Sequence, residues 1–228
     1  MAVLILNKTG PMSKSKDDHN RDEAYTLDDP AKHRRYYDEW ASTYDDDFLK
    51  AEGYAAPYHV AQALTAEALA NETPIADIGC GTGAVGRCLL QLGTTLTLDG
   101  FDISQGMLDE AQKTSQYRNL ICADFTQDQS QHLGQYGAIV SSGTFTLGHL
   151  GPEDLGRTLA LGRHDALVLI SINEQHFEEK GFKGALQDWY NRGMITTPDF
   201  HQISLYFDPS IVTADSKTGL LTKFRLIK

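Results

Sequence analysis

The chain has 228 residues, 41% of them hydrophobic and 22% charged, which is an ordinary composition for a globular protein with one full core. Its 20 Lys and Arg residues against 31 Asp and Glu give a formal net charge of −11, which disfavours polyanions, so we expect no nucleic-acid partner. The chain has no apolar run of membrane-spanning length and opens with no secretory signal, so we expect a cytoplasmic protein without a membrane partner.

Residues 7–28 are polar and charged without an apolar period, and we expect residues 1–28 to form a flexible tail. A helix is predicted from Pro30, behind the capping residues Asp28 and Asp29. Three of its aromatic side chains share one face by their spacing: Tyr37, Trp40 and Tyr44. Such a stripe either packs into a core or covers a ligand, and we expect residues 29–56 to form a lid.

Strands and helices then alternate along the chain. Helices are predicted at 60–69, 84–92, 105–114 (capped by Ser104) and 153–161, and strands at 75–78, 95–101, 119–122, 136–142 and 166–172. Residues 174–189 are predicted to be helical, and 200–207 and 221–227 to be strands. This alternation predicts an α/β fold with a doubly wound, mostly parallel sheet, and we expect residues 29–228 to form a single domain.

The first predicted strand runs into three alternate glycines, Gly79, Gly81 and Gly83. Glycine at such a turn lets a ligand approach the backbone, and the following helix offers free N–H groups. The next apolar run ends in Asp99 and Asp102, and a carboxylate there can accept hydrogen bonds from both ribose hydroxyls. Asp102 has the spacing expected of a ribose-binding acid, and Asp99 is the competing choice. The glycine loop followed by such an acid predicts an adenosine-containing cofactor.

Two cofactor patterns fit this stretch. Gly81, Gly83 and Gly86 match the dinucleotide fingerprint, which favours NAD. The same residues, read with Asp77 before them, match Asp-x-Gly-x-Gly-x-Gly. A carboxylate at that place repels a pyrophosphate but suits a cationic amino-acid end. We therefore favour S-adenosyl-L-methionine (SAM), whose ammonium can pair with Asp77 directly or through a water.

With these motifs the chain resembles the class I SAM-dependent methyltransferases over roughly residues 30–207. The matching segments are 77–83, 100–108, 123–125 and 136–142. The lid helix with residues 143–149 and 181–195 is most similar to the methyltransferase-like proteins related to the Williams–Beuren syndrome region product. The resemblance implies a Rossmann-like fold with a C-terminal antiparallel strand, and SAM as cofactor with S-adenosyl-L-homocysteine (SAH) as product.

The resemblance also implies which residues hold the cofactor. They come from the lid, the glycine loop and the ends of the following strands: Tyr37, Trp40, Tyr44, Asp77, Gly79, Cys80, Gly81, Thr82, Gly83, Asp102, Ile103, Met107, Asp124, Phe125 and Ser142. Each has a structural alternative; the aromatic stripe, for example, also suits a buried helix face.

The sequence gives weaker evidence for the residues that bind or activate the methyl acceptor. His149 follows the fourth strand and could take a proton from a nucleophile, while Asn173 and Glu174 end the fifth strand and could orient a substrate. The cysteines show no metal-ligand spacing, so we expect no metal. The acidic surface and the lid favour methyl transfer to an O or N atom of a small molecule. The alternatives are a SAM-binding regulatory or partner protein without efficient catalysis, and an NAD-dependent oxidoreductase.

Overall fold

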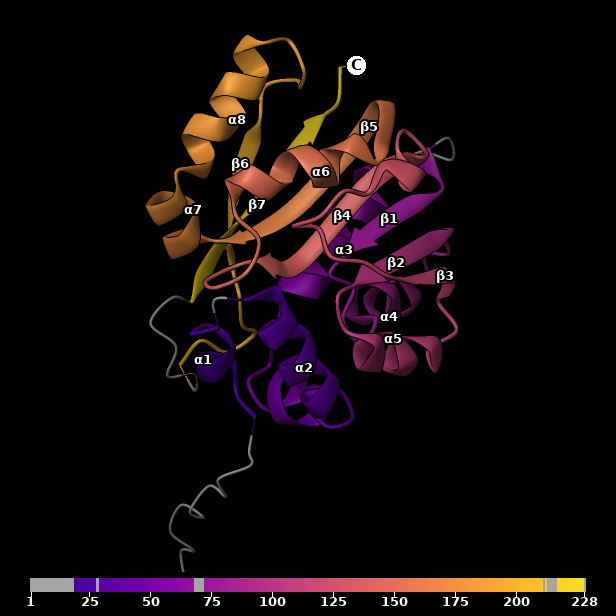
Figure 1. Cartoon of the computed structure of the whole chain (residues 1–228), viewed down its shortest axis with the longest axis vertical. Coiled ribbons are helices and arrows are strands. Elements are labelled where there is room, and N and C mark those ends of the chain that lie inside the picture. Colours follow the sequence, from indigo (N-terminus) through magenta and orange to yellow (C-terminus); the bar gives the residue numbers. More distant parts are fainter. Residues whose placement is uncertain (1–18, 28, 68–71, 211, 213–216, 228) are drawn as a thin grey trace, which may run out of the picture.

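The computed structural model describes residues 19–27, 29–67, 72–210, 212 and 217–227. These residues contain a seven-stranded sheet with helices packed on both of its faces (Figure 1). Its strands are β1 (Ile75–Ile78), β2 (Leu98–Asp102), β3 (Tyr117–Cys122), β4 (Tyr136–Phe145), β5 (Gly162–Asn173), β6 (Asp199–Ser204) and β7 (Thr218–Arg225). Their order in the sheet is β3-β2-β1-β4-β5-β7-β6.

The strand directions confirm the predicted fold class. Strands β1 to β5 are parallel to one another, whereas β7 runs antiparallel between β5 and β6. The strand order reverses between β1 and β4, and ligands of open α/β sheets bind beyond the carboxyl ends of the strands at such a point. The fold therefore predicts where the functional site lies.

Two apolar layers cover the sheet. On one face pack α3 (Ala56–Glu67) and α4 (Ala84–Gln91), with Val60, Leu64 and Leu89 fully or almost fully buried. The opposite face carries α6 (Leu155–Ala160), α7 (Glu174–Lys180) and α8 (Phe182–Asn191). Further along, α5 (Gln105–Gln112) packs on β2 and β3 and is capped by Ser104, as predicted. Two short 3-10 turns complete this part: η3 (Ser130–His132) and η4 (Pro152–Asp154).

The N-terminal segment covers one end of the sheet (Figure 1). It contains α1 (Arg21–Ala24), α2 (Pro30–Trp40) and the π-helix η1 (Asp45–Lys50). The prediction of a flexible tail was wrong for residues 19–27, which are ordered, with Arg21 and Ala24 buried. Long-range bonds fix them: the Arg21 guanidinium pairs with Glu52 and donates to the Tyr206 hydroxyl over 2.8 Å. The rest of the predicted tail, residues 1–18 and 28, lies outside the described residues.

Some element boundaries differ from the prediction for local reasons. Helix α3 starts at Ala56, because Pro57 fits its first turn and does not break it. The predicted helical segment 174–189 is two helices, since Gly181 takes a left-handed φ of 75° between α7 and α8. Strand β5 begins earlier than predicted, at Gly162.

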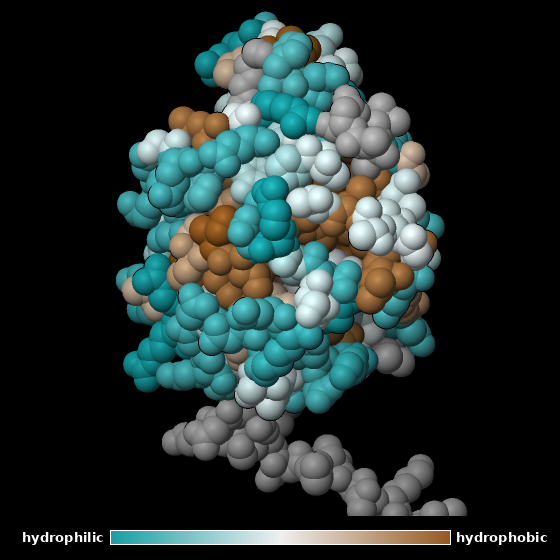
Figure 2. Space-filling view, turned by 90° about the vertical axis from the view of Figure 1, so that its right-hand side faces the viewer, coloured by the Kyte–Doolittle hydropathy of each residue, from teal (hydrophilic) through white to brown (hydrophobic). Residues whose placement is uncertain are grey.

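The sheet ends in an open edge at β3, where Arg118 and Asn119 are exposed. Figure 2 shows the molecule from the side on which β3 lies, where hydrophilic side chains cover most of the surface and hydrophobic atoms show in patches among them. Among the described residues, no helix is long and apolar enough to cross a bilayer.

Candidate active site

The glycine loop after β1 allows β4 and a ligand to come close to its backbone. Gly79, Gly81 and Gly83 have positive φ values of 65°, 53° and 85°, which side chains rarely adopt. A Cβ on Gly79 would lie 1.8 Å from the Thr144 Oγ1 atom, so the loop can pack against β4 only with glycine there. A Cβ on Gly81 would meet no atom within 4 Å, which leaves that backbone open to a ligand.

Asp102 stands at the carboxyl end of β2 beside this loop. Its Oδ2 accepts a hydrogen bond from the Gly81 N–H over 2.8 Å, and its Oδ1 accepts one from the Ser104 N–H over 2.9 Å. Burial raises the pKa of this carboxyl to about 6, against the effect of those two bonds. The competing Asp99 points elsewhere: its carboxylate binds the Arg118 guanidinium and the Tyr136 hydroxyl. The geometry therefore selects Asp102 over Asp99.

A cavity of about 350 Å³ opens beyond these strand ends. This size falls in the range of small-molecule sites. Of the residues proposed from the sequence, most line it: Tyr37, Trp40, Tyr44, Gly79, Cys80, Gly81, Thr82, Asp102, Ile103, Met107, Asp124, Phe125, Ser142 and His149. The cavity thus brings together residues that are more than a hundred positions apart in the chain.

One half of the cavity is built by the strand ends, and we call Gly79, Gly81, Asp102, Met107 and Phe125 the strand-end half. Met107 and Phe125 are almost completely buried and supply apolar walls. Ser142 also lines the cavity, but its hydroxyl oxygen is buried and has no hydrogen-bond partner among the described residues.

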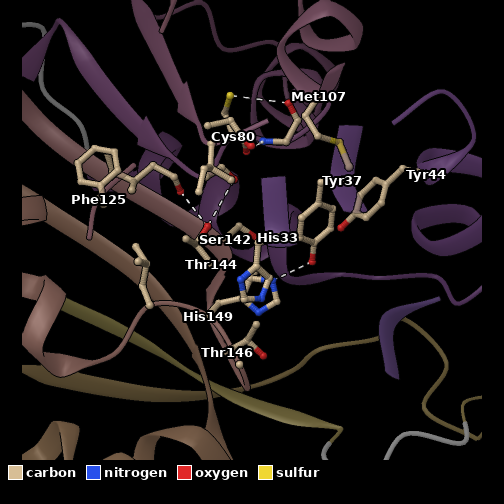
Figure 3. Close-up of a pocket in the computed structure, with 18 of the residues that line it drawn as sticks. His33, Tyr37, Tyr44, Cys80, Met107, Phe125, Ser142, Thr144, Thr146 and His149 are labelled. Atoms are coloured by element: carbon tan, nitrogen blue, oxygen red, sulfur yellow. Dashed lines mark hydrogen bonds between the residues drawn. The ribbon is translucent and has the colours of Figure 1, made fainter. Parts of the chain in front are cut away.

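The opposite end of the cavity is built mainly by the N-terminal helices and the segment after β4. We call its residues, Tyr25, His33, Tyr37, Thr146 and His149, the histidine end. Figure 3 shows His33, Tyr37, Thr146 and His149 gathered together, with Phe125 on the other side of the view. The rings of His33 and His149 have centroids 4.5 Å apart, and the Tyr25 ring meets His149 edge-on at 6.1 Å.

Both ring nitrogens of His149 are used in hydrogen bonds. Nδ1 lies 2.9 Å from the Leu147 carbonyl oxygen, which can only accept, so Nδ1 carries the proton. Nε2 therefore accepts from the Tyr37 hydroxyl over 2.9 Å (Figure 3). Burial, with a smaller contribution from His33, lowers the pKa of His149 to about 4. The imidazole is thus neutral, with its lone pair already occupied.

Two carboxylates fasten the lid to the glycine loop and to α5. Asp38 of α2 accepts from the Ser104 hydroxyl over 2.6 Å and from the Gly106 N–H over 2.9 Å. Asp45 of η1 accepts from the Thr82 hydroxyl over 2.5 Å and pairs with Arg87 over 2.9 Å. These bonds join α2 to α5, and η1 to the glycine loop and α4.

Four residues proposed from the sequence do not line the cavity. Gly83 lies behind it as the N-cap of α4. Asp77 is fully buried and accepts from the Tyr117 hydroxyl over 2.7 Å, while its Oδ1 has no partner among the described residues. Burial raises the pKa of Asp77 to about 7. The predicted direct pairing of Asp77 with an ammonium group does not match this placement.

The two predicted substrate residues, Asn173 and Glu174, have structural bonds instead. The Asn173 side chain caps α7 by accepting from the His176 N–H over 3.1 Å. The Glu174 carboxylate accepts from Gln202 of β6 and from Thr218 of β7. The Glu174 bonds join the start of α7 to the antiparallel edge of the sheet, and neither Asn173 nor Glu174 lines the cavity.

Sequence reasoning missed several lining residues, notably Arg21, Tyr25, His33 and Thr146. His33 stands one helical turn before Tyr37, so the aromatic stripe could have been extended to it. Arg21 and Tyr25 lie in a charged segment without periodicity and give no such signal. Among the described residues, no three His, Cys, Asp or Glu side chains cluster as metal ligands.

Comparisons with known proteins relate the chain to methyltransferases. Residues 75–164 match the protein family described as "Methyltransferase domain". Methyltransferase-like protein 27 of Homo sapiens is 33% identical over 131 residues, which cover 56% of this chain and 52% of that protein. The chain therefore spans about half the length of the curated relative that it matches.

Solved structures show the same fold at low identity. The magnesium protoporphyrin IX methyltransferase of Synechocystis PCC 6803, crystallised with bound SAM, has a TM-score of 0.59 and 17% identity, covering 88% of this chain and 98% of that chain. A SAM-dependent methyltransferase of Thermotoga maritima, described as a possible histamine N-methyltransferase, has a TM-score of 0.56 and 14% identity, covering 84% and 98%. The chain thus has the fold of class I SAM-dependent methyltransferases.

Proposed function

We propose that the protein is a SAM-dependent methyltransferase that transfers a methyl group to an O or N atom of a small molecule. The observation that carries the proposal is the cavity at the switch point of the sheet, which is lined by the open Gly81 backbone and by Asp102.

The residues present fit SAM. Asp102 would accept hydrogen bonds from the ribose hydroxyls, and Met107 and Phe125 would flank the adenine. Asp77 would act from behind the loop and not by direct contact. The competing pyrophosphate of NAD would have to lie against a loop that already contains two buried carboxylates, Asp77 and Asp102.

Methyl transfer from SAM mainly requires that the protein position the acceptor relative to the methyl group. Bound SAM supplies an activated methyl group, and the protein has to hold an acceptor in line with it and exclude water. The lid helix α2 and η1, fastened through Asp38 and Asp45, would enclose the reactants. A free catalytic base is not required where the acceptor arrives with an available lone pair. His149, proposed from the sequence as such a base, would then position other groups through Tyr37.

The same proposal includes the size of the acceptor, a closer relationship to one group of proteins and a cellular location. A cavity of about 350 Å³ suits a small acceptor better than a macromolecule. We also propose a relationship to the proteins of the Williams–Beuren syndrome region, on the resemblance of the lid and of residues 143–149, and a cytoplasmic location, on the three free cysteines.

One alternative has support of its own. The lone pair of His149 is occupied by Tyr37, so a protein that binds SAM as a sensor or partner subunit would use the same cavity without turnover. SAM binding without transfer to any tested acceptor would favour this alternative.

Calorimetric titration with SAM, SAH and NAD tests the proposal. We expect micromolar binding of SAM and SAH and no binding of NAD. Binding of NAD without binding of SAM would refute the proposal and favour an oxidoreductase.

A further inference from the structure

Residues 20–27, which we call the N-terminal strap, form part of the wall at the histidine end of the cavity. Arg21 and Tyr25 of the strap line the cavity, and a hydrogen bond joins the side chains of Tyr25 and Thr146. The strap backbone also packs closely against the segment after β4, because a Cβ on Gly148 would lie 2.6 Å from the Tyr25 carbonyl oxygen. The position of the strap therefore decides how closely this end of the cavity is covered.

Polar bonds hold the strap to three other segments of the chain. The Tyr36 hydroxyl of α2 accepts from the Asn20 N–H over 2.7 Å and donates to the Asn20 carbonyl oxygen over 2.8 Å. The Arg21 guanidinium pairs with Glu52, which follows η1, and donates to the hydroxyl of Tyr206, which follows β6. The strap is thus fastened to α2 and to the segments after η1 and β6.

The strap has little apolar packing of its own. Within residues 20–27, all of which the structure describes, Ala24 alone is a buried hydrophobic side chain, and Leu27 is half-buried. The strap helix α1 has four residues, and a helix of that length is not stable without contacts from outside. Segments with few buried apolar contacts can open locally while the rest of a protein stays folded. The strap is therefore suited to open by itself.

The charge of Arg21 is what fastens the strap. Its side chain is 6% exposed, and its bonds to Glu52 and Tyr206 run from the strap to other segments, whereas Asp22, which also binds it, belongs to the strap. A buried charge that loses its partner is strongly unfavourable, while an apolar side chain of similar size at the same place is tolerated. Opening of the strap would return an unpaired guanidinium to water. The pair of Arg21 with Glu52 can therefore act as a latch.

From these contacts we propose that the N-terminal strap is a gate of the cavity, which opens to admit and release ligands and is closed by the ion pair between Arg21 and Glu52. The inference goes beyond the proposed methyl transfer and rests on it only in taking the cavity as the SAM site. A gate changes the rates at which a ligand enters and leaves together, whereas a residue that only contacts the ligand changes mainly the rate of leaving.

Hydrogen exchange of the ligand-free protein measures opening of the strap. We expect Glu52→Ala to raise the amide exchange rates of residues 20–27 at least tenfold, because Arg21 loses its partner, while the amides of β4 and β5 keep their rates. Arg21→Met removes the buried charge itself and should raise the strap rates less than threefold. Unchanged strap rates in Glu52→Ala, or equal effects of both variants, would overturn the latch. Faster exchange along the whole chain would show that the strap does not open by itself and would contradict the inference.

Glu110→Ala is the matched control. The Glu110 side chain of α5 is 26% exposed, close to the 29% of Glu52, and it pairs with Lys113. Because Lys113 is 69% exposed, this variant leaves no buried charge without a partner. We expect wild-type exchange in the strap. An effect as large as that of Glu52→Ala would mean that the strap responds to any lost ion pair, which would contradict the latch.

Stopped-flow binding of SAH, followed by the fluorescence of Trp40 in the cavity wall, tests whether the strap gates the ligand. We expect Glu52→Ala to speed association and dissociation at least fivefold each, with the equilibrium affinity within threefold of wild type. A change in dissociation alone would make the strap a ligand contact and overturn the gate, as would unchanged rates. Failure of SAH to bind the wild-type protein would refute the proposed function, and the exchange experiment would still decide whether the latch holds the strap.

Discussion

The two ends of the cavity differ in how the chain builds them. The strand-end half comes from residues that directly follow β1, β2 and β3, so a local pattern of strand, loop and helix fixes it. At the histidine end, residues near the N-terminus meet the segment after β4: Tyr37 and His149 are 112 positions apart. The cofactor part of such a site is therefore visible in a sequence, while the acceptor part depends on long-range packing.

The largest expected effect is in the strand-end half. We expect Asp102→Ala to weaken SAM binding about a hundredfold, because hydrogen bonds to a charged group contribute about 1.5–3 kcal/mol each and 1.4 kcal/mol is tenfold in affinity. Calorimetry measures the change, with the exposed Asp188→Ala of α8 as the control. Unchanged affinity in Asp102→Ala would remove the assigned ribose contact.

Asp77 should affect the stability of the ligand-free protein. Its folded pKa of about 7 lies above its ordinary value of 3.8, so between these values the folded protein holds a proton that the unfolded chain has lost. Stability therefore falls as the pH rises from about 4 to 7. We expect Asp77→Asn to raise the free energy of unfolding by about 2 kcal/mol at pH 8 and little at pH 4.5. Urea denaturation at both pH values checks this, and equal effects at both would contradict it.

A substitution at Asn173 distinguishes a residue that stabilises the fold from one that binds substrate. Because its side chain caps α7, Asn173→Ala should lower the free energy of unfolding by about 1 kcal/mol. SAM and acceptor affinities should stay unchanged, since Asn173 does not line the cavity. Thermal denaturation and calorimetry measure the two quantities. Loss of acceptor binding at full stability would restore the substrate role that the sequence suggested.

The smallest expected effect concerns the lid. Asp45 pairs with Arg87 at the partly exposed edge of the glycine loop, where such pairs contribute about 0.2–1 kcal/mol. We expect Asp45→Ala to speed SAM dissociation about threefold in a stopped-flow displacement experiment. The exposed Asp46→Ala, whose partner Lys50 lies on the same helix, serves as the control. Identical rates in both variants would mean that Asp45 does not hold the lid.

The sequence predicted the fold and most of the strand-end half for clear physical reasons. Alternating strands and helices define a parallel sheet, and glycine at a strand end marks close approach. It could not predict that the Tyr117 hydroxyl, 40 positions away, donates a hydrogen bond to the Asp77 carboxylate. Nor could it predict that Arg21 would be buried against Tyr206 or that Tyr25 would line the cavity, because residues 19–27 have no apolar period.

A crystal structure of the protein with SAH tests the central claim most directly. The account predicts the ribose hydroxyls on the Asp102 carboxylate, the adenine between Met107 and Phe125, and the sulfur facing the histidine end. SAH bound elsewhere, or bound with its ribose away from Asp102, would contradict it.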